Sequence, residues 1–413
     1  MRSTALAHQK PNFGDTGRRK RLPPNPGVLP LATLASLIFV VAASAQNVSF
    51  LRKTTFENRA ALVMSNDRME LTILSTGGAL ANLVLADDPE KLSPFWNPIR
   101  MARESGQETT FGAAIGHFVC VDGFGPVSPE EAAAKLPGHG EAHTVPWQVT
   151  FSDKLASIAT LAFKAELPIV QETFTRTFRM VDGENIIHVQ SELESRLGFD
   201  RPVNWAEHAT IGSPFLAPEV TVVDLSGKQA KTLKHPAKQA LPLRLASFQD
   251  FEWPMAPQTA GGTADLRSVP ASPNSLDHIT CRLDPARRLE WVTAINTAKQ
   301  LILGYVFKRT EYPWLQDWEF YPASLKMARG MEFATQPFDV PRRDAIQTNS
   351  MFDTSTYRWL PAKSKIESRF LLFYAKTPEG FRKVDDVKLE GGKLIVEDRQ
   401  DGKQIVLEAS LPL

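Results

Sequence analysis

The segment VQETFTRTFRMVDGENIIHVQSELE, residues 170–194, carries the pattern that decides the fold. Its apolar and polar residues separate by parity in the first half: Val170, Phe174, Phe178 and Met180 against Gln171, Thr173, Thr175 and Thr177. Asp182-Gly183 is a turn signal, and the alternation resumes after it from Ile187 to Glu194. A period of two is that of a half-buried strand. The segment therefore predicts a long antiparallel hairpin.

Similar strand-like segments recur along the chain, usually separated by Gly, Pro, Asn or Asp: 69–74, 157–167, 220–225, 289–295, 301–308 and 366–374. One short helix is expected, with Ser128 as its N-cap, Pro129 at its first position and an end near Lys135. Many strands with few helical periods predict an all-β sandwich of antiparallel sheets rather than a βαβ fold.

The first 45 of the 413 residues differ from the rest. A basic stretch at 18–21 precedes an apolar run at 31–43 and the small residues Ala43-Ser44-Ala45. This order predicts a signal peptide cleaved near Ala45, and hence a periplasmic or secreted protein, with a membrane anchor as the alternative. We expect residues 46–380 to form one β-sandwich domain, because no repeat or linker divides them, and residues 381–413 to add a C-terminal β-hairpin.

Charge and cysteine content limit the partners. Residues 1–45 hold six basic residues and one acidic residue, so the remaining chain has 41 Lys+Arg against 45 Asp+Glu, a net charge near −4. This balance argues against a nucleic-acid partner or stable membrane insertion of the mature chain. Cys120 and Cys281 are the only thiols and could pair in an oxidising compartment, but two cysteines cannot make a four-thiolate metal site.

Three polar segments are candidates for a functional site. The first, 116–147, contains His117, His139, Glu141 and His143. The alternate spacing of the last three places them on one face of a strand rather than at i, i+4 of a helix. We therefore predict no metal and no cofactor, and we consider sugar binding or plain loop polarity instead.

The second segment is NWAEHATIGSPF, residues 204–215, with Asn204 at its start and His208 at the end of an apolar run. A histidine there can exchange a proton with a ligand near neutral pH. A hydrogen-bonded structural histidine is the alternative.

The third segment covers residues 311–319 and 329–336, with Trp314, Glu319 and Glu332. Its aromatic residues alternate with acids and amides, a composition that suits a saccharide, because flat rings pack on C–H faces and polar groups bind hydroxyls. Ordinary aromatic core beside solvated turns is the other interpretation.

Taken together, these segments resemble the galactose mutarotase-like (aldose 1-epimerase-like) superfamily. Phe111–Gly116, FGAAIG, looks like the family's FGATIGR segment, and His139-Gly140-Glu141 with Trp147 looks like its HGG…W segment. Residues 331–336, MEFATQ, resemble the late LETQ-type motif. The matches span roughly residues 60–375 in the family's order.

The resemblance implies a supersandwich of antiparallel sheets and acid/base interconversion of sugar anomers. Glu332 would be the general base on the anomeric hydroxyl, and His208 the general acid on the ring oxygen, held on opposite sides of a ring-sized space. His139 would hydrogen-bond the same region. Glu319 is a rival for the base.

The chain departs from the family where the sugar-binding arginine is expected, since it has Gly116-His117 and then Cys120-Val121-Asp122. We expect His139, Glu141, His117, Asn204, Trp314 and Glu319 to bind substrate. The leading hypothesis is an exported aldose 1-epimerase-like enzyme acting on a small saccharide. A non-catalytic carbohydrate-binding protein and a polysaccharide-active lyase or hydrolase relative are the alternatives.

Overall fold

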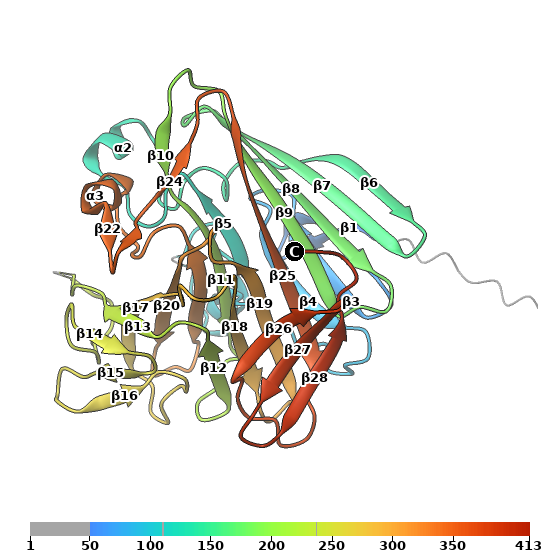
Figure 1. Cartoon of the computed structure of the whole chain (residues 1–413), viewed down its shortest axis with the longest axis vertical. Coiled ribbons are helices and arrows are strands. Elements are labelled where there is room, and N and C mark those ends of the chain that lie inside the picture. Colours follow the sequence, from blue (N-terminus) through green and yellow to red (C-terminus); the bar gives the residue numbers. More distant parts are fainter. Residues whose placement is uncertain (1–49, 110, 237) are drawn as a thin grey trace, which may run out of the picture. The chain divides into compact units, whose positions relative to one another are not determined.

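Two antiparallel sheets form the framework of this computed structural model, which describes residues 50–109, 111–236 and 238–413 (Figure 1). The eleven-stranded sheet has the order β1 (Leu51–Phe56), β2 (Arg59–Ser65), β3 (Met69–Leu74), β4 (Leu80–Leu85), β5 (His117–Val121), β11 (Trp205–Gly212), β21 (Ala328–Ala334), β20 (Trp314–Tyr321), β17 (Ser275–Arg282), β13 (Gln229–Thr232) and β14 (Asp250–Glu252). The eight-stranded sheet has the order β12 (Thr221–Leu225), β18 (Leu289–Asn296), β19 (Leu301–Lys308), β25 (Lys365–Lys376), β9 (Ile186–Ser195), β8 (Glu172–Val181), β7 (Ile158–Leu167) and β6 (Gln148–Leu155). The predicted all-β class is confirmed.

The predicted hairpin is also confirmed. Strands β8 and β9 pair antiparallel with Thr177 opposite Gln190. Gly183 takes a positive φ of 85° in the turn between them, a conformation that glycine adopts without strain. Phe174, Phe178 and Met180 are fully buried, so the sequence parity correctly identified the face of β8 that enters the core.

The helices are short, and the structure has three among the described residues: α1 (Pro98–Glu104), α2 (Pro129–Ala133) and α3 (Arg342–Thr348). The predicted start of α2 is confirmed, because the Ser128 hydroxyl accepts from the Glu131 amide while the Glu131 side chain accepts from the Ser128 amide. This reciprocal capping box satisfies two amides that the first turn leaves unpaired.

Small sheets complete the fold: β10 (Arg201–Val203) with β24 (Arg358–Leu360), β15 (Met255–Pro257) with β16 (Thr263–Asp265), and β22 (Ser350–Met351) with β23 (Thr354–Ser355). The C-terminal region forms a three-stranded sheet of β26 (Asp386–Glu390), β27 (Lys393–Asp398) and β28 (Lys403–Glu408). Two of these strands were expected as a hairpin, and β26 is the additional strand. The expected signal peptide or anchor at residues 1–45 lies outside the described residues.

Both cysteines are buried and free, which corrects the expectation that they could pair. Cys120 is on β5 and Cys281 is on β17, and β11, β21 and β20 lie between these strands in the sheet. Neighbouring strands are about 4.8 Å apart, whereas a disulfide needs Cα atoms within about 7 Å.

The main core lies between the two sheets. Phe307 of β19 stacks on Phe333 of β21, with ring centroids 4.3 Å apart and planes 8° apart. Trp205 of β11 packs edge-on against Phe174 of β8 at 5.5 Å. Each of these contacts joins a strand of one sheet to a strand of the other, so the facing residues are those that hold the sandwich together.

A buried ionic network lies within this core. The Arg176 guanidinium of β8 donates to the Glu207 carboxylate of β11 at 2.5 Å, and His117 lies 2.9 Å from the other carboxylate oxygen. The Tyr312 hydroxyl and the Trp205 indole also donate to Glu207, each at 3.1 Å. Burial alone would raise the pKa of Glu207, but the Arg176 charge and these hydrogen bonds lower it below its ordinary value.

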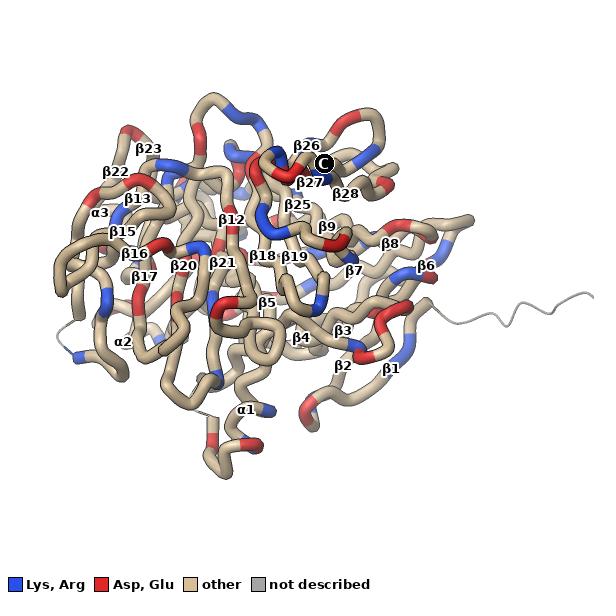
Figure 2. The backbone as a smooth tube through the Cα atoms, turned by 90° about the horizontal axis from the view of Figure 1, so that it is seen from below, with Lys and Arg blue, Asp and Glu red and all other residues tan. Residues whose placement is uncertain are grey.

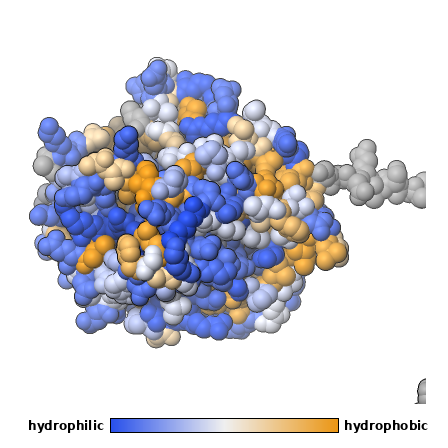
Figure 3. Space-filling view, turned by 90° about the horizontal axis from the view of Figure 1, so that it is seen from above, coloured by the Kyte–Doolittle hydropathy of each residue, from blue (hydrophilic) through white to orange (hydrophobic). Residues whose placement is uncertain are grey.

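Charges of both signs are distributed over the outside. In Figure 2, Lys and Arg segments are interspersed with Asp and Glu segments, and neither sign forms a continuous face in that view. Figure 3 shows a second face on which hydrophilic residues predominate and hydrophobic ones form separate groups. Within the part of the chain that the structure describes, no helix is long and apolar enough to span a membrane.

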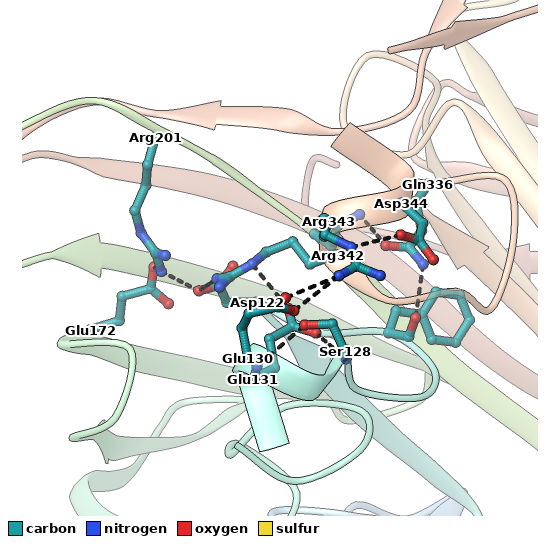
Figure 4. Close-up of polar contacts among 12 residues, drawn as sticks. Asp122, Ser128, Glu130, Glu131, Glu172, Arg201, Gln336, Arg342, Arg343 and Asp344 are labelled. Carbon is teal, nitrogen blue, oxygen red and sulfur yellow. Dashed lines mark hydrogen bonds and ion pairs between the residues drawn. The ribbon is translucent and has the colours of Figure 1, made fainter. Parts of the chain in front are cut away.

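A second cluster of ion pairs ties loops to the end of β5 (Figure 4). Asp122 is fully buried and takes contacts from Arg201 of β10 and from Arg342 of α3, the latter at 2.5 Å. Arg201 also donates to Glu172 of β8 at 2.5 Å. Burial, together with the nearby Asp122 charge, raises the pKa of Glu172 to about 8. The cluster thereby fixes α3 and β10 next to the strands that carry the candidate site.

We predict that Glu207→Gln will destabilise the protein by about 3–5 kcal/mol, because it leaves the buried Arg176 charge without its counter-ion. Urea unfolding followed by circular dichroism measures this change. Glu90→Gln is the matched control, since its ion pair with Lys299 is exposed and an exposed pair contributes about 1 kcal/mol or less. Equal effects of the two substitutions would contradict the role given to Glu207.

Candidate active site

Alternation along β11 sends neighbouring side chains to opposite faces of the large sheet. Glu207 points into the core, where it meets Arg176 of the other sheet. His208 points to the outer face and stacks on Phe118 of β5, with ring centroids 4.2 Å apart. The register agrees, because His208 is directly opposite Phe118 in the ladder. The candidate site is therefore built on the face that the second sheet does not cover.

A cavity of about 320 Å³ lies on this outer face. It is lined by aromatic side chains, imidazoles and two carboxyl groups: Trp96, Phe111, Ala114, Phe118, His139, His143, His208, His278, Trp318, Glu332 and Asp339. The three residues that the resemblance implicates in proton transfer, His139, His208 and Glu332, thus converge on one space.

His208 and Glu332 are adjacent rather than on opposite sides of the cavity, which corrects one expectation. His208 Nε2 lies 3.2 Å from Glu332 Oε1. Gly330 makes room for this contact, because a Cβ at that position would come within 2.1 Å of Glu332 Oε1. The two oxygens that exchange protons in anomerisation are both bonded to C1 of the sugar, so adjacent groups can serve both.

Thr210 lies beside the other ring nitrogen of His208. His208 Nδ1 lies 2.8 Å from Thr210 Oγ1, and the Thr210 hydroxyl lies 3.5 Å from the His208 carbonyl oxygen. In the tautomer that carries its proton on Nδ1 and donates it to Thr210, Nε2 faces Glu332 as an acceptor. Burial lowers the pKa of His208 well below its ordinary value, and the neighbouring His139 and His278 add to this effect.

Glu332 has the opposite shift. Burial raises its pKa well above the ordinary value, and the carboxyl groups of Asp339 and Asp317 act in the same direction. Both shifts favour the uncharged forms, and a pair that shares one proton holds it on Glu332 in that form.

His139 is held as a hydrogen-bond donor. The backbone amide of Gly125 donates to His139 Nδ1 at 3.2 Å, so a neutral imidazole must carry its proton on Nε2. Burial lowers the pKa of His139 to about 4, which keeps the ring neutral near pH 7. Its Nε2–H is the group that can bind a ligand oxygen in the cavity.

The other titratable groups of the lining have pKa values shifted toward their uncharged forms. Burial lowers the pKa of His143 to about 4, and it lowers the pKa of His278. Burial raises the pKa of Asp339, whose Oδ1 is buried without a hydrogen-bond partner. No Lys or Arg of the described part of the chain lines the cavity. Among the described residues, no group of three or more His, Cys, Asp or Glu side chains could hold a metal ion.

Two residues predicted to bind substrate are on or near β5 but away from the cavity. His117 directly precedes Phe118 on β5, so its side chain points to the opposite face of the sheet. There, in the core, it contacts Glu207. Glu141 accepts from the backbone amides of Ile169 and Val170 at 3.2 and 3.0 Å. These positions do not support direct substrate contact, and they correct that expectation.

Three further predicted binding residues are also away from the cavity lining. Asn204 contacts Gln336 beneath the loops of α3. The Trp314 indole donates to the Ser355 carbonyl at 2.8 Å and is fully buried. Glu319 is on the core face, where Arg244 binds it at 2.6 Å. Glu319 is therefore not placed to act as the rival base.

Sequence reasoning missed several residues that line the cavity, notably His278, Trp318 and Asp339. His278 and Trp318 are directly opposite each other in the β17–β20 ladder. The alternation of apolar and polar residues in 279–282 is the signal that could have revealed the end of β17. No local signal marks Asp339, because it follows β21 in an irregular segment.

Solved structures from three bacteria have a similar fold. A galactose mutarotase-like protein from Clostridium acetobutylicum is 12% identical, with a TM-score of 0.52, covering 79% of this chain and 99% of its own. A protein from Klebsiella pneumoniae provisionally named an aldose 1-epimerase is 10% identical, with a TM-score of 0.57, covering 79% and 83%. A galactose mutarotase related enzyme from Lactobacillus acidophilus is 12% identical, with a TM-score of 0.50, covering 80% and 100%.

No protein-family model and no curated protein sequence matches the chain. The similarity is therefore one of three-dimensional structure, and at these identities it concerns the fold alone. The chain has a galactose mutarotase-like fold.

Proposed function

We propose that this protein is an aldose 1-epimerase-like enzyme that interconverts the anomers of a reducing saccharide. The observation that carries the proposal is the His208–Glu332 pair, whose atoms lie 3.2 Å apart at the wall of an aromatic cavity. The fold is one in which the neighbours named above are described as mutarotase-like or epimerase-like proteins. Export from the cytoplasm belongs to the proposal, on the strength of residues 1–45 alone.

Anomerisation requires one proton to leave the C1 hydroxyl and another to reach the ring oxygen. From the neutral pair, His208 Nε2 takes the hydroxyl proton and Glu332 gives its proton to the ring oxygen. The C1–ring oxygen bond breaks and the C1 carbonyl forms. After rotation about the C1–C2 bond, ring closure on the other face reverses both transfers and restores the pair.

This direction is opposite to the one implied by the resemblance, in which Glu332 takes the proton and His208 gives it. Both directions use the same two residues, because the pair holds one proton in either case. The neutral resting state favours Glu332 as the first donor. His139, with its proton on Nε2, is placed to hydrogen-bond an oxygen at the same centre.

The lining also favours an uncharged sugar. It contains no Lys or Arg among the described residues, and His139 and His143 are neutral near pH 7 because burial lowers their pKa values to about 4. A phosphate or carboxylate on the sugar would lose its hydration without gaining a counter-ion. Neutral aldoses are therefore the proposed substrate class.

We predict that Glu332→Gln will lower kcat by about 100-fold or more, because glutamine can neither give nor take the proton. Two-dimensional exchange NMR on glucose and galactose, with the buffer rate subtracted, measures anomer exchange. Glu319→Gln is the matched comparison, since Glu319 is equally buried but on the core face. It should keep its activity per folded molecule, and full activity of Glu332→Gln would refute the proposal.

We also predict that kcat/KM will show a pH plateau on which the active pair holds one proton. The rate should fall in acid, once His208 takes a second proton below its lowered pKa. It should fall in alkali, once Glu332 loses its proton above its raised pKa. An inflection near 6.5, the ordinary histidine pKa, would show that His208 titrates as a free imidazole and would contradict the shared-proton account.

A further inference from the structure

A second cavity, of about 240 Å³, adjoins the one that holds His208 and Glu332. Trp96 and Phe111 line both cavities and form their common boundary. The far side of the second cavity is formed by α1 and by the segment around Pro322 and Lys326. The two cavities therefore lie side by side and share a wall of two aromatic side chains.

An aromatic floor runs from one cavity into the other. Trp318, in the first, and Phe320, in the second, are two residues apart on β20 and face the same side of the sheet. Their rings are 5.8 Å apart and within 14° of parallel. Phe111 stands edge-on against Phe320 at 5.5 Å. Trp318 and Phe320 are only partly buried, so ring surface is left for a ligand.

Polar groups surround the second cavity. Gln107, Glu108 and Thr109 line it after α1, and Ser324 and Lys326 line it opposite. Lys326 is paired with Glu104 at 2.6 Å, so its charge is already compensated. Aromatic faces bordered by amide and hydroxyl groups suit a neutral sugar ring, which presents C–H faces and an equatorial rim of hydroxyls.

We propose that the second cavity is a subsite for a second sugar ring, and that the substrate is a reducing oligosaccharide of at least two units. This inference rests on the proposed function. The reducing-end ring lies over Trp318 with C1 at the His208–Glu332 pair. The next ring lies against Phe320 and Phe111. The free hydroxyl at C1 remains in the first cavity, so the chain extends from the other end of the reducing ring.

The test compares sugars that share a reducing-end ring. Exchange NMR gives kcat/KM for glucose against maltose, cellobiose and lactose, and for galactose against β-1,4-galactobiose. The wild-type protein should favour at least one disaccharide over its monosaccharide. Phe320→Ala should lower that disaccharide-to-monosaccharide ratio by about tenfold, the effect of losing one aromatic contact.

Two more variants keep the test independent of folding defects. Ser324→Trp fills the second cavity from an exposed position and should lower the same ratio. Phe199→Ala removes a phenylalanine that is 62% exposed in the turn between β9 and β10 and should leave the ratio unchanged. A wild-type preference for the monosaccharide, or a ratio insensitive to Phe320→Ala and Ser324→Trp, would overturn the subsite while leaving the proposed epimerase function intact.

If no sugar exchanges its anomers faster with the protein than in buffer, the proposed function fails. A binding measurement then tests whether the second cavity is a sugar subsite. Saturation-transfer NMR with the same sugars then applies. Tighter binding of a disaccharide than of its monosaccharide, weakened by Phe320→Ala and by Ser324→Trp, supports the subsite. Equal or absent binding overturns it.

Discussion

The contact between Arg176 and Glu207 is the interaction on which the rest of the structure depends. It joins β8 of one sheet to β11 of the other inside an apolar core, and it fixes which way β11 is turned. Because side chains alternate on a strand, a Glu207 that faces Arg176 leaves His208 facing outward. The buried ion pair thus sets the orientation of the strand that carries the proposed acid/base residue. Burying these two charges costs desolvation free energy. This cost is offset because four side chains contact the Glu207 carboxylate: Arg176, His117, Tyr312 and Trp205.

On the outer face of the large sheet, the pKa of a buried glutamate is shifted in the opposite direction. The core network keeps Glu207 charged by surrounding it with Arg176 and hydrogen-bond donors. No Lys or Arg among the described residues lines the cavity beside Glu332, and burial raises the pKa of Glu332. Two glutamates on adjacent strands of one sheet therefore have pKa values shifted in opposite directions. One is suited to holding the fold, and the other to exchanging a proton with a neutral sugar.

Much of the fold could be predicted from the sequence, because alternation is a local signal. The parity of residues 170–194 identified both strands of the β8–β9 hairpin and the face that enters the core. Strand pairing was beyond reach, since it depends on contacts between residues far apart in the chain. β17 and its His278 were missed because alternation in that strand is limited to residues 279–282. The C-terminal sheet was expected with two strands instead of three.

The candidate site was predicted in part. Motif order identified His139, His208 and Glu332, which do meet at one cavity. His117, Glu141, Asn204, Trp314 and Glu319 were selected by residue type and neighbourhood, but they lie outside the cavity lining. His117 and Glu319 show why: each is one residue out of phase with a residue that lines the cavity, Phe118 and Trp318. The composition of such a strand does not reveal which of its two faces packs against the second sheet. The strand register in the structure does.

The most direct test of this account compares His208→Asn with His117→Asn in the same two measurements, anomer exchange by NMR and the urea midpoint of unfolding. The two histidines are close in the same sheet but face opposite sides. We predict that His208→Asn abolishes exchange and leaves the midpoint nearly unchanged, and that His117→Asn lowers the midpoint and leaves exchange per folded molecule intact. Full exchange by His208→Asn would contradict the central claim that the outward-facing pair carries the chemistry.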